Sequence, residues 1–563
     1  MAQASGNRRN EVKRQNRTRS SGQYGGQNIY HQQQQYMQNP MQEPQQLGNN
    51  MPQQTFVQRG KQMETRKTGL TAAQKRERLL RKREQERKKR RNYRIAAAFA
   101  VILVILGGYK LIRMVSGSSG GEEDTMDVLD LTETVDPEEA AYSGPPVATI
   151  SFLGDVSTSA AQVDAATGDN GNIDFTGVFA DIEDQLSATD YAVCNFETTM
   201  VDNLNYGGEP YYNAPIQLAG ALNSLGIRLV STANTYMLNN GIEGLISTRK
   251  YLHQAGLSSV GTYVSQEERD ENSGVYLRTI HKIKFGFLSY TKGTDAVTMP
   301  EGCEYAMNTL YTDYSDYWTD LRTSQIRADV QAARNAGAEV IVMLVHWGSE
   351  YSRSVSEPQK ELASRLFSYG VDVIIGTHSH VVNSMEFQDV ELSDGTKKKC
   401  FVAYGLGDFY TDPEQESGQE SVILNLTFSR DEAGTVSITQ VGYVPIYHNI
   451  AENNGKRSFQ VLDAYSTLAK LYRSDDISSQ EATLYNNLLD TISTVKYYAG
   501  EEFDQGPQDA DLRVVRQAVE SGEYSVFDIR AIQEEEKQAA KEADQAPAEE
   551  PVEEPVEETE PEE

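Results

Sequence analysis

Several apolar runs in the middle of this chain end in short polar motifs, and this pattern constrains its fold more than any other feature. The motifs are Gly154-Asp155, Asn195-Phe196-Glu197, Ala233-Asn234-Thr235-Tyr236, His346-Trp347-Gly348 and Gly376-Thr377-His378-Ser379-His380. Buried strands of α/β proteins read as apolar runs, and functional groups collect at their carboxyl ends. We therefore expect these motifs to converge on one point.

The residue types in these motifs are ligands for hard or borderline divalent metal ions. The chain has only 7 His, and three of them, His346, His378 and His380, fall at two predicted strand ends. Alternate residues point to the same side of an extended backbone, so His378 and His380 are predicted to face one centre. A metal there would bind phosphate or polarise a scissile bond. Taken singly, each motif also fits a turn, a surface loop or a core histidine.

The order of predicted elements indicates an α/β fold. Strand-like runs lie at 147–153, 191–195, 228–231, 340–345, 371–375 and 401–406. Helical patterns lie at 242–255, 317–336 and 357–369. Residues 275–290 and 421–447 alternate with period two and read as antiparallel hairpins, whereas residues 458–530 read as helical. This mixture predicts a layered sandwich of mixed β-sheets flanked by helices.

Composition divides the chain into segments of different character. The N-terminal residues are rich in Gln, Asn and Gly and then basic, and the C-terminal residues are acidic and interrupted by Pro. Such segments bury too little apolar surface to fold. We predict a disordered basic region at 1–94, a transmembrane helix at 95–115, a linker at 116–145, the main domain at 146–450, a helical appendage at 451–530 and a disordered acidic tail at 531–563.

A strong charge asymmetry surrounds the apolar run 95–115. Residues 1–94 contain 22 Lys and Arg against 6 Asp and Glu, a net charge of +16, so the rest must carry −46 to give the total of −30. The uncharged part of the run is shorter than the roughly 20 residues of a typical span, but Lys110 and Arg113 can extend it by snorkelling. The positive-inside rule places the basic side in the cytoplasm. We predict a single-pass protein of the cell membrane with an extracellular main domain.

The basic segment before this run suggests its partner. Residues 75–94 are dense in Lys and Arg, a pattern that also occurs in nucleic-acid-binding arms. Their position directly against an apolar run favours anionic lipid headgroups instead. We therefore predict contact with membrane lipid through residues 75–115 and no nucleic-acid partner. The three Cys residues give no disulfide framework, which fits a bacterial cell surface better than a eukaryotic secretory route.

Seven ordered motifs in the central region resemble a known family. They are ISFLGDV at 150–156, CNFETTM at 194–200, VSTANTYMLNNGIEGL at 230–245, AGLSSVGTY at 255–263, MLVHWGSEY at 343–351, VDVIIGTHSHVV at 371–382 and VAYGLGDF at 402–409. Over residues 147–447 the chain resembles the bacterial CapA-type capsule biosynthesis proteins linked to poly-γ-glutamate. Their domain is similar to calcineurin-like metallophosphatases.

The resemblance implies a set of metal ligands. The ligands implied by the family pattern, together with the loop position Asn234, are Asp155, Glu197, Asn234, His346, His378 and His380. The implied cofactor is a divalent ion, Mn, Mg, Zn or Fe. The loop at 234 usually reads Asn-Asn-His with an Asp three residues later, and here Thr235, Tyr236 and Asn239 stand at those positions.

This departure leaves two functions open. With an unperturbed pKa near 10, Tyr236 is a poor acid–base group at neutral pH. One reading is a metal-dependent hydrolase, a metallophosphoesterase-like enzyme, with His346 and Tyr236 as candidate catalytic residues. The other is a non-catalytic polymer-binding or scaffold subunit with a degenerate metal site. Either reading implies an anionic surface polymer or other capsule-synthesis membrane proteins as partners.

Overall fold

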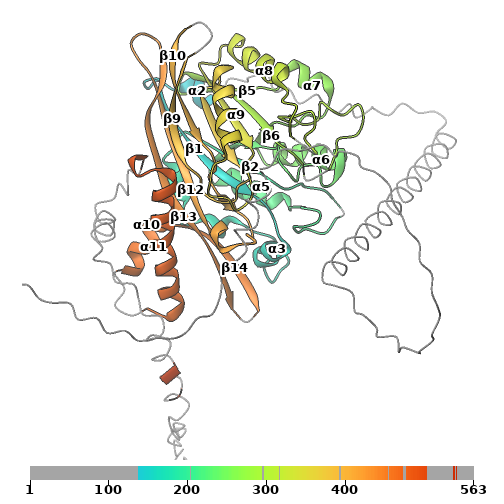
Figure 1. Ribbon diagram of the computed structural model, residues 1–563. Helices are drawn as coiled ribbons and strands as arrows, with labels where there is room; N and C mark the ends of the chain where they lie inside the picture. The colour runs from blue at the N-terminus through green and yellow to red at the C-terminus, as the bar shows by residue number, and fades with distance from the viewer. Residues whose placement is uncertain are drawn as a thin grey trace, which may run out of the picture. The chain divides into compact units, whose positions relative to one another are not determined.

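The computed structural model describes residues 137–202, 204–294, 297–315, 318–391, 395–453, 455–472, 477–503, 537–538 and 541 (Figure 1). The predicted basic region, the predicted span at 95–115 and most of the linker lie outside these residues, as does nearly all of the acidic tail. Within the described part of the chain, no helix combines the length and the apolar character that a membrane crossing requires.

Eight strands form the first sheet. In spatial order they are β14 (Lys456–Asp463), β13 (Val436–Asn453), β12 (Glu420–Arg430), β1 (Val147–Val156), β2 (Tyr191–Phe196), β3 (Ile227–Ser231) and β4 (Ser258–Val260), and β11 (Asp408–Tyr410) pairs with the end of β1. The strands from β1 to β4 run parallel, whereas β12, β13 and β14 are antiparallel. The predicted hairpin at 421–447 is confirmed by β12 and β13.

Six strands form the second sheet. Their order is β5 (Tyr276–Ile280), β6 (Ile283–Thr291), β7 (Val340–His346), β8 (Val373–Thr377), β10 (Lys397–Ala403) and β9 (Met385–Glu391). The predicted hairpin at 275–290 is β5 with β6, and the strands from β6 to β10 run parallel. Both sheets are therefore mixed, as the sequence predicts.

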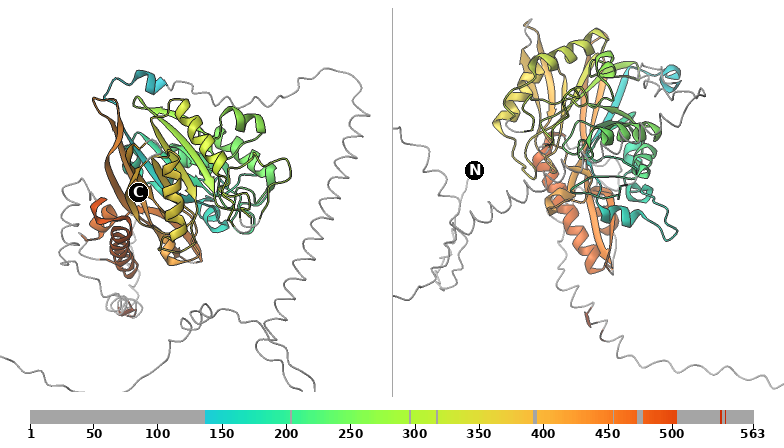
Figure 2. Two further views of the ribbon diagram at one scale, coloured as in Figure 1. Left: turned by 45° about the horizontal axis from the view of Figure 1, so that its top comes forward. Right: turned by 90° about the vertical axis from the view of Figure 1, so that its right-hand side faces the viewer.

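The two sheets pack against each other through a core of large apolar side chains. Phe152 of the first sheet, with Phe287, Val342 and Phe401 of the second, is fully buried in this layer. Helices cover both outer faces (Figure 2). The first sheet carries α3 (Ala160–Ala166), α5 (Ile216–Ser224) and α6 (Gly241–Gln254), and the second carries α8 (Thr323–Asn335) and α9 (Glu357–Ser368). The predicted sandwich of mixed sheets flanked by helices is confirmed.

Short elements and two C-terminal helices complete the described chain. The short ones are α2 (Pro137–Ala141), η1 (Thr176–Phe179), α4 (Glu183–Ser187), α7 (Gln266–Glu271), η2 (Glu416–Gln419) and η3 (Glu501–Phe503). The C-terminal helices are α10 (Ala464–Tyr472) and α11 (Ser479–Ala499). The prediction of helix from residue 458 was wrong at its start, because 458–463 belong to β14 and pair with β13.

Helix α11 is tied to the loop that follows β7. Thr494 donates a hydrogen bond to Glu420 at 3.2 Å, and Glu420 also pairs with Arg353. The guanidinium of Arg353 lies 5.1 Å from the ring centroid of Tyr498. Helix α11 thus packs on the same loop that carries Tyr351, whose ring stacks 5.3 Å from that of His380.

Two glycines allow the loops at one edge of the sheets to approach closely. A Cβ at Gly154 would lie 1.8 Å from the carbonyl oxygen of Gly407, and a Cβ at Gly376 would lie 2.0 Å from that of Tyr404. No other residue fits such backbone contacts. They bring the ends of β1 and β8 against the segment 404–408.

Candidate metal centre

The polar motifs meet at the carboxyl ends of the parallel strands. Asp155 pairs in register with Asn195 of β2 and with Asp408 of β11, and His346 pairs with Thr377 of β8. The backbone N–H of His378 donates to Asp155 Oδ2 at 3.0 Å and so joins the two sheets at this edge. The structure thus brings the predicted ligands of both sheets together in a buried cluster.

The first group of possible ligands is Glu197, His346 and His378. All three are buried, and their ligand atoms lie within 4.8 Å of one another. Nε2 of His346 lies 3.1 Å from Glu197 Oε1. The hydroxyl of Thr377 lies 3.0 Å from Nδ1 of His346 and holds the ring so that Nε2 faces Glu197.

The second group is Asp155, His380 and Asp408, again with ligand atoms within 4.8 Å of one another. Nδ1 of His380 lies 2.7 Å from Asp408 Oδ1 and 4.0 Å from Asp155 Oδ2. The hydroxyl of Thr411 donates to the other Asp408 oxygen at 2.6 Å. Asp408 was not among the sequence-predicted ligands, although it follows a strand-like run and lies in the motif VAYGLGDF.

The extended backbone from which His378 and His380 were predicted to face one centre is not present. Both residues have positive φ, 86° and 56°, so the segment is not extended and the rule of alternate residues does not apply. The two imidazoles therefore belong to different groups. Their ring centroids are 6.3 Å apart.

The amide of Asn195 connects the two groups, and the amide of Asn234 contacts Asn195. The Asn195 side chain donates to Asp155 Oδ1 at 2.6 Å and lies 3.4 Å from Nδ1 of His346. Asn234 donates to Asn195 Oδ1 at 3.1 Å and to the Phe196 carbonyl at 2.8 Å. The buried Oδ1 of Asn234 has no hydrogen-bond partner among the described residues. Asn234 thus lies beside the cluster, and its Oδ1 atom is available to accept a hydrogen bond or bind a metal ion.

The donor set fits divalent cations. Both carboxylate oxygens of Glu197 are buried and lack a well-aligned hydrogen-bond donor among the described residues, with only His346 and Thr235 close to them. A buried carboxylate in that state is costly unless it is protonated or binds a cation. Burial, with the neighbouring Glu197, raises the pKa of Asp155 to about 7, and burial raises the pKa of Glu197 to about 8. Carboxylate and imidazole together suit Mn, Fe or Zn.

The three histidines differ in their protonation. Burial lowers the pKa of His346 to about 3 and that of His378 well below its usual value, so both rings are neutral and able to bind metal. Burial opposes the charge on His380 too, but Asp408 outweighs it and the pKa of His380 lies well above its usual value. Without a cation, the second group therefore retains an imidazolium.

Of the residues that depart from the family pattern in the loop 234–239, Thr235 contacts the first group. The hydroxyl of Thr235 lies 2.9 Å from Nε2 of His346 and 3.5 Å from Nδ1 of His378. Tyr236 stacks on Tyr212 with ring centroids 3.9 Å apart, and burial together with Glu197 raises its pKa well above the usual value. Asn239 does not join the groups, and its amide lies 3.4 Å from the Pro210 carbonyl. At neutral pH Tyr236 can therefore donate a hydrogen bond but cannot act as a base.

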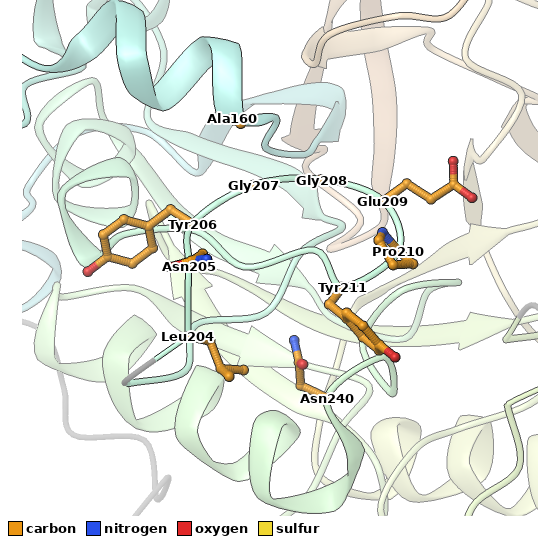
Figure 3. Close-up of a pocket in the computed structure, with 10 residues that line it drawn as sticks. All are labelled: Ala160, Leu204, Asn205, Tyr206, Gly207, Gly208, Glu209, Pro210, Tyr211 and Asn240. Carbon is orange, nitrogen blue, oxygen red and sulfur yellow. The ribbon is translucent and has the colours of Figure 1, made fainter. Parts of the chain in front are cut away.

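A cavity of about 590 Å³ lies at the segment that precedes Tyr212 (Figure 3). Its wall is the loop 204–211 together with Ala160 and Asn240. Tyr206 and Tyr211 are 44% and 48% exposed, and their side chains lie on opposite sides of the loop in Figure 3. Tyr212, which directly follows this loop, stacks on Tyr236.

Two packed sheets with paired carboxylate and imidazole groups at one edge define an α/β protein whose buried clusters can hold metal. The family model described as bacterial capsule synthesis protein PGA_cap matches residues 149–413, which include every member of both groups. By this match, residues 149–413 form a CapA-type region of the bacterial capsule synthesis family. Strands β12 to β14 and helices α10 and α11 lie beyond the matched residues.

Two curated relatives carry the same family name. The chain is 25% identical over 294 residues to the capsule biosynthesis protein CapA of Bacillus anthracis, covering 51% of this chain and 64% of the relative. It is 22% identical over 308 residues to the PGA biosynthesis protein CapA of Bacillus subtilis strain 168, covering 54% and 74%. The chain thus spans less than two thirds of the B. anthracis relative.

Among solved structures, the chain is similar to the NAD nucleotidase of Haemophilus influenzae. It is 13% identical and covers 67% of each chain with a TM-score of 0.34. This TM-score is too low to carry its activity over to the present chain.

Proposed function

We propose that this CapA-type protein is a membrane-anchored, extracellular metallophosphatase-like hydrolase that binds two divalent ions and acts in the production of an anionic surface polymer, poly-γ-glutamate by family resemblance. The observation that carries the proposal is the presence of two adjoining ligand groups, each with carboxylate and imidazole donors. Glu197, His346 and His378 would hold one ion, and Asp155, His380 and Asp408 the other. Asn234 would supply its free amide oxygen nearby.

The surrounding residues orient this set. Asp155 accepts hydrogen bonds on both oxygens, from Asn195 and from the His378 backbone, so its carboxylate is fixed between the groups. Thr377 and Thr411 orient His346 and Asp408 in the same way. Bound divalent ions would supply Lewis-acid activation of water and of the scissile bond. Tyr236 would donate a hydrogen bond to a leaving group, which is weaker assistance than proton transfer from an imidazolium.

Metal analysis of the purified full chain tests this proposal. We expect two divalent ions per chain near pH 8.5 and fewer near pH 6, because ligands must lose their protons to bind metal. The pKa values of about 7 for Asp155 and about 8 for Glu197 make metal affinity rise as the pH rises through 7 to 8, and the raised pKa of His380 acts in the same direction. Slow hydrolysis of bis(p-nitrophenyl) phosphate should follow the metal content. A metal-free chain at every pH would contradict the proposal.

The proposal also includes the location of the chain. Residues 95–115 would cross the cell membrane once, with the Lys- and Arg-rich residues 75–94 on anionic lipid in the cytoplasm. Protease added to intact wall-stripped cells should digest the main domain and leave an N-terminal tag protected. Loss of that tag with retention of the domain would reverse the orientation.

A specific observation favours a second candidate, a non-catalytic polymer-binding subunit. Tyr236 stands at the position of the family's imidazole, and its ring stacks on Tyr212 instead of serving as an acid–base group. In this case the chain would bind metal without hydrolysing the diester. Its partners would then be the surface polymer itself or other capsule-synthesis membrane proteins.

A further inference from the structure

A lysine lies at the same edge of the second sheet as the metal ligands. Lys292 directly follows β6, whose last residue Thr291 pairs with His346. The backbone N–H of Lys292 donates to the His346 carbonyl at 2.9 Å. Lys292 is thus fixed beside the group formed by Glu197, His346 and His378.

The side chain of Lys292 is held in a half-buried position. Its ammonium donates to the Gly348 carbonyl and lies 5.0 Å from the ring centroid of Trp318. The indole of Trp318 is itself held by a hydrogen bond of 2.8 Å to the Tyr314 carbonyl. Among the described residues no carboxylate lies within ion-pair distance of Lys292, although Glu350 acts on it at longer range. The cation is therefore positioned without a direct counter-ion.

A cation in this place suits an anionic ligand. The ammonium is a compact point charge that binds phosphate or carboxylate oxygens, and partial burial strengthens such a contact. Because the backbone of Lys292 is hydrogen-bonded to that of His346 at 2.9 Å, an anion bound to its ammonium would lie beside the first ligand group.

We propose that Lys292 binds an oxyanion of the substrate, phosphate or carboxylate, next to the bond that the metal centre acts on. This inference rests on the proposed function, because it assigns a substrate class to the same site. It predicts that the substrate carries a negative charge close to its scissile bond. Trp318 would position the ammonium of Lys292, and the fluorescence of Trp318 would change when the anion binds.

Tryptophan fluorescence of the zinc-loaded full chain tests the proposal. The chain has two Trp, and both lie near this edge, Trp318 beside Lys292 and the buried Trp347 next to His346, so emission should change when an anion binds there. We expect saturable changes on titration with inorganic phosphate or with γ-glutamylglutamate, and the stronger ligand identifies the oxyanion. Lys292→Met should weaken that binding at least about tenfold, and Lys292→Arg should largely restore it.

Lys282 provides a matched control at the opposite end of β6. Its ammonium also donates to a carbonyl, that of Gly144, and lies 5.6 Å from the ring centroid of Tyr142. Lys282→Met should leave anion binding unchanged. Equal anion affinity in Lys292→Met and the native chain would overturn the proposal, and so would the absence of saturable binding by either anion. If anion binding depends on Lys292 but the chain has no diesterase activity, the anion site is supported and the proposed hydrolase function is contradicted.

Discussion

The double variant Thr235→Asn with Tyr236→His is expected to hydrolyse bis(p-nitrophenyl) phosphate about 10²–10⁴-fold faster than the native chain, because it gains an acid–base imidazole. Thr235 already contacts His346 at 2.9 Å, so an amide there would add a ligand oxygen to the first group. Rates of the metal-loaded full chains at equal metal content measure the effect.

The single variants separate the two contributions. Thr235→Asn alone should raise metal affinity, and Tyr236→His alone should raise the rate at fixed metal content. Tyr236 stacks on Tyr212, so matched melting temperatures are needed to show that the loop stays folded. Robust native activity that disappears in the double variant would instead make Tyr236 a catalytic residue.

Asp408→Asn is expected to reduce the metal content from two ions to one and to lower diester hydrolysis at least about 100-fold. The carboxylate of Asp408 lies 2.7 Å from His380, and an amide is a far weaker ligand that also removes the counter-charge of that ring. Glu197, His346 and His378 are untouched, so the first ion should remain. Metal analysis and initial rates of the full chain measure both effects.

Asp412→Asn is the matched control, because Asp412 follows in the same loop and pairs with Arg457 rather than with a histidine. It should leave metal content unchanged. Glu197→Gln should remove the ion of the first group, and the ion of the second group should stay bound. If the Asp408→Asn variant still bound two ions, Asp408 would not be a ligand, and the assignment of ligands in the second group would be wrong.

The strands that lead to the site could be predicted because their apolar runs are long and end abruptly. The run at 340–345 corresponds to β7, and the polar residue that follows it, His346, lies in the cluster. The sequence could not show that 456–463 form a strand, because β14 depends on its pairing with β13 far more than on its own mixed pattern.

The division of the site into two groups was also beyond the sequence. It depends on the positive φ of His378 and His380 and on the pairing of β11 with β1, which places Asp408 opposite Asp155. An aspartate after Gly407 reads locally as a turn. Only the approach of Gly154 to Gly407 across the sheet brings its carboxylate to His380.

The contact of α11 with the loop after β7 limits how far this protein can be truncated from its C-terminus while it still folds. A chain shortened to the family-matched residues 149–413 would lose Glu420 as well as Thr494, and Arg353 would be left without its carboxylate. That arginine shares a short loop with Tyr351, which covers His380. The minimal folded unit therefore extends through α11, and sequence similarity alone would set its C-terminal limit too early.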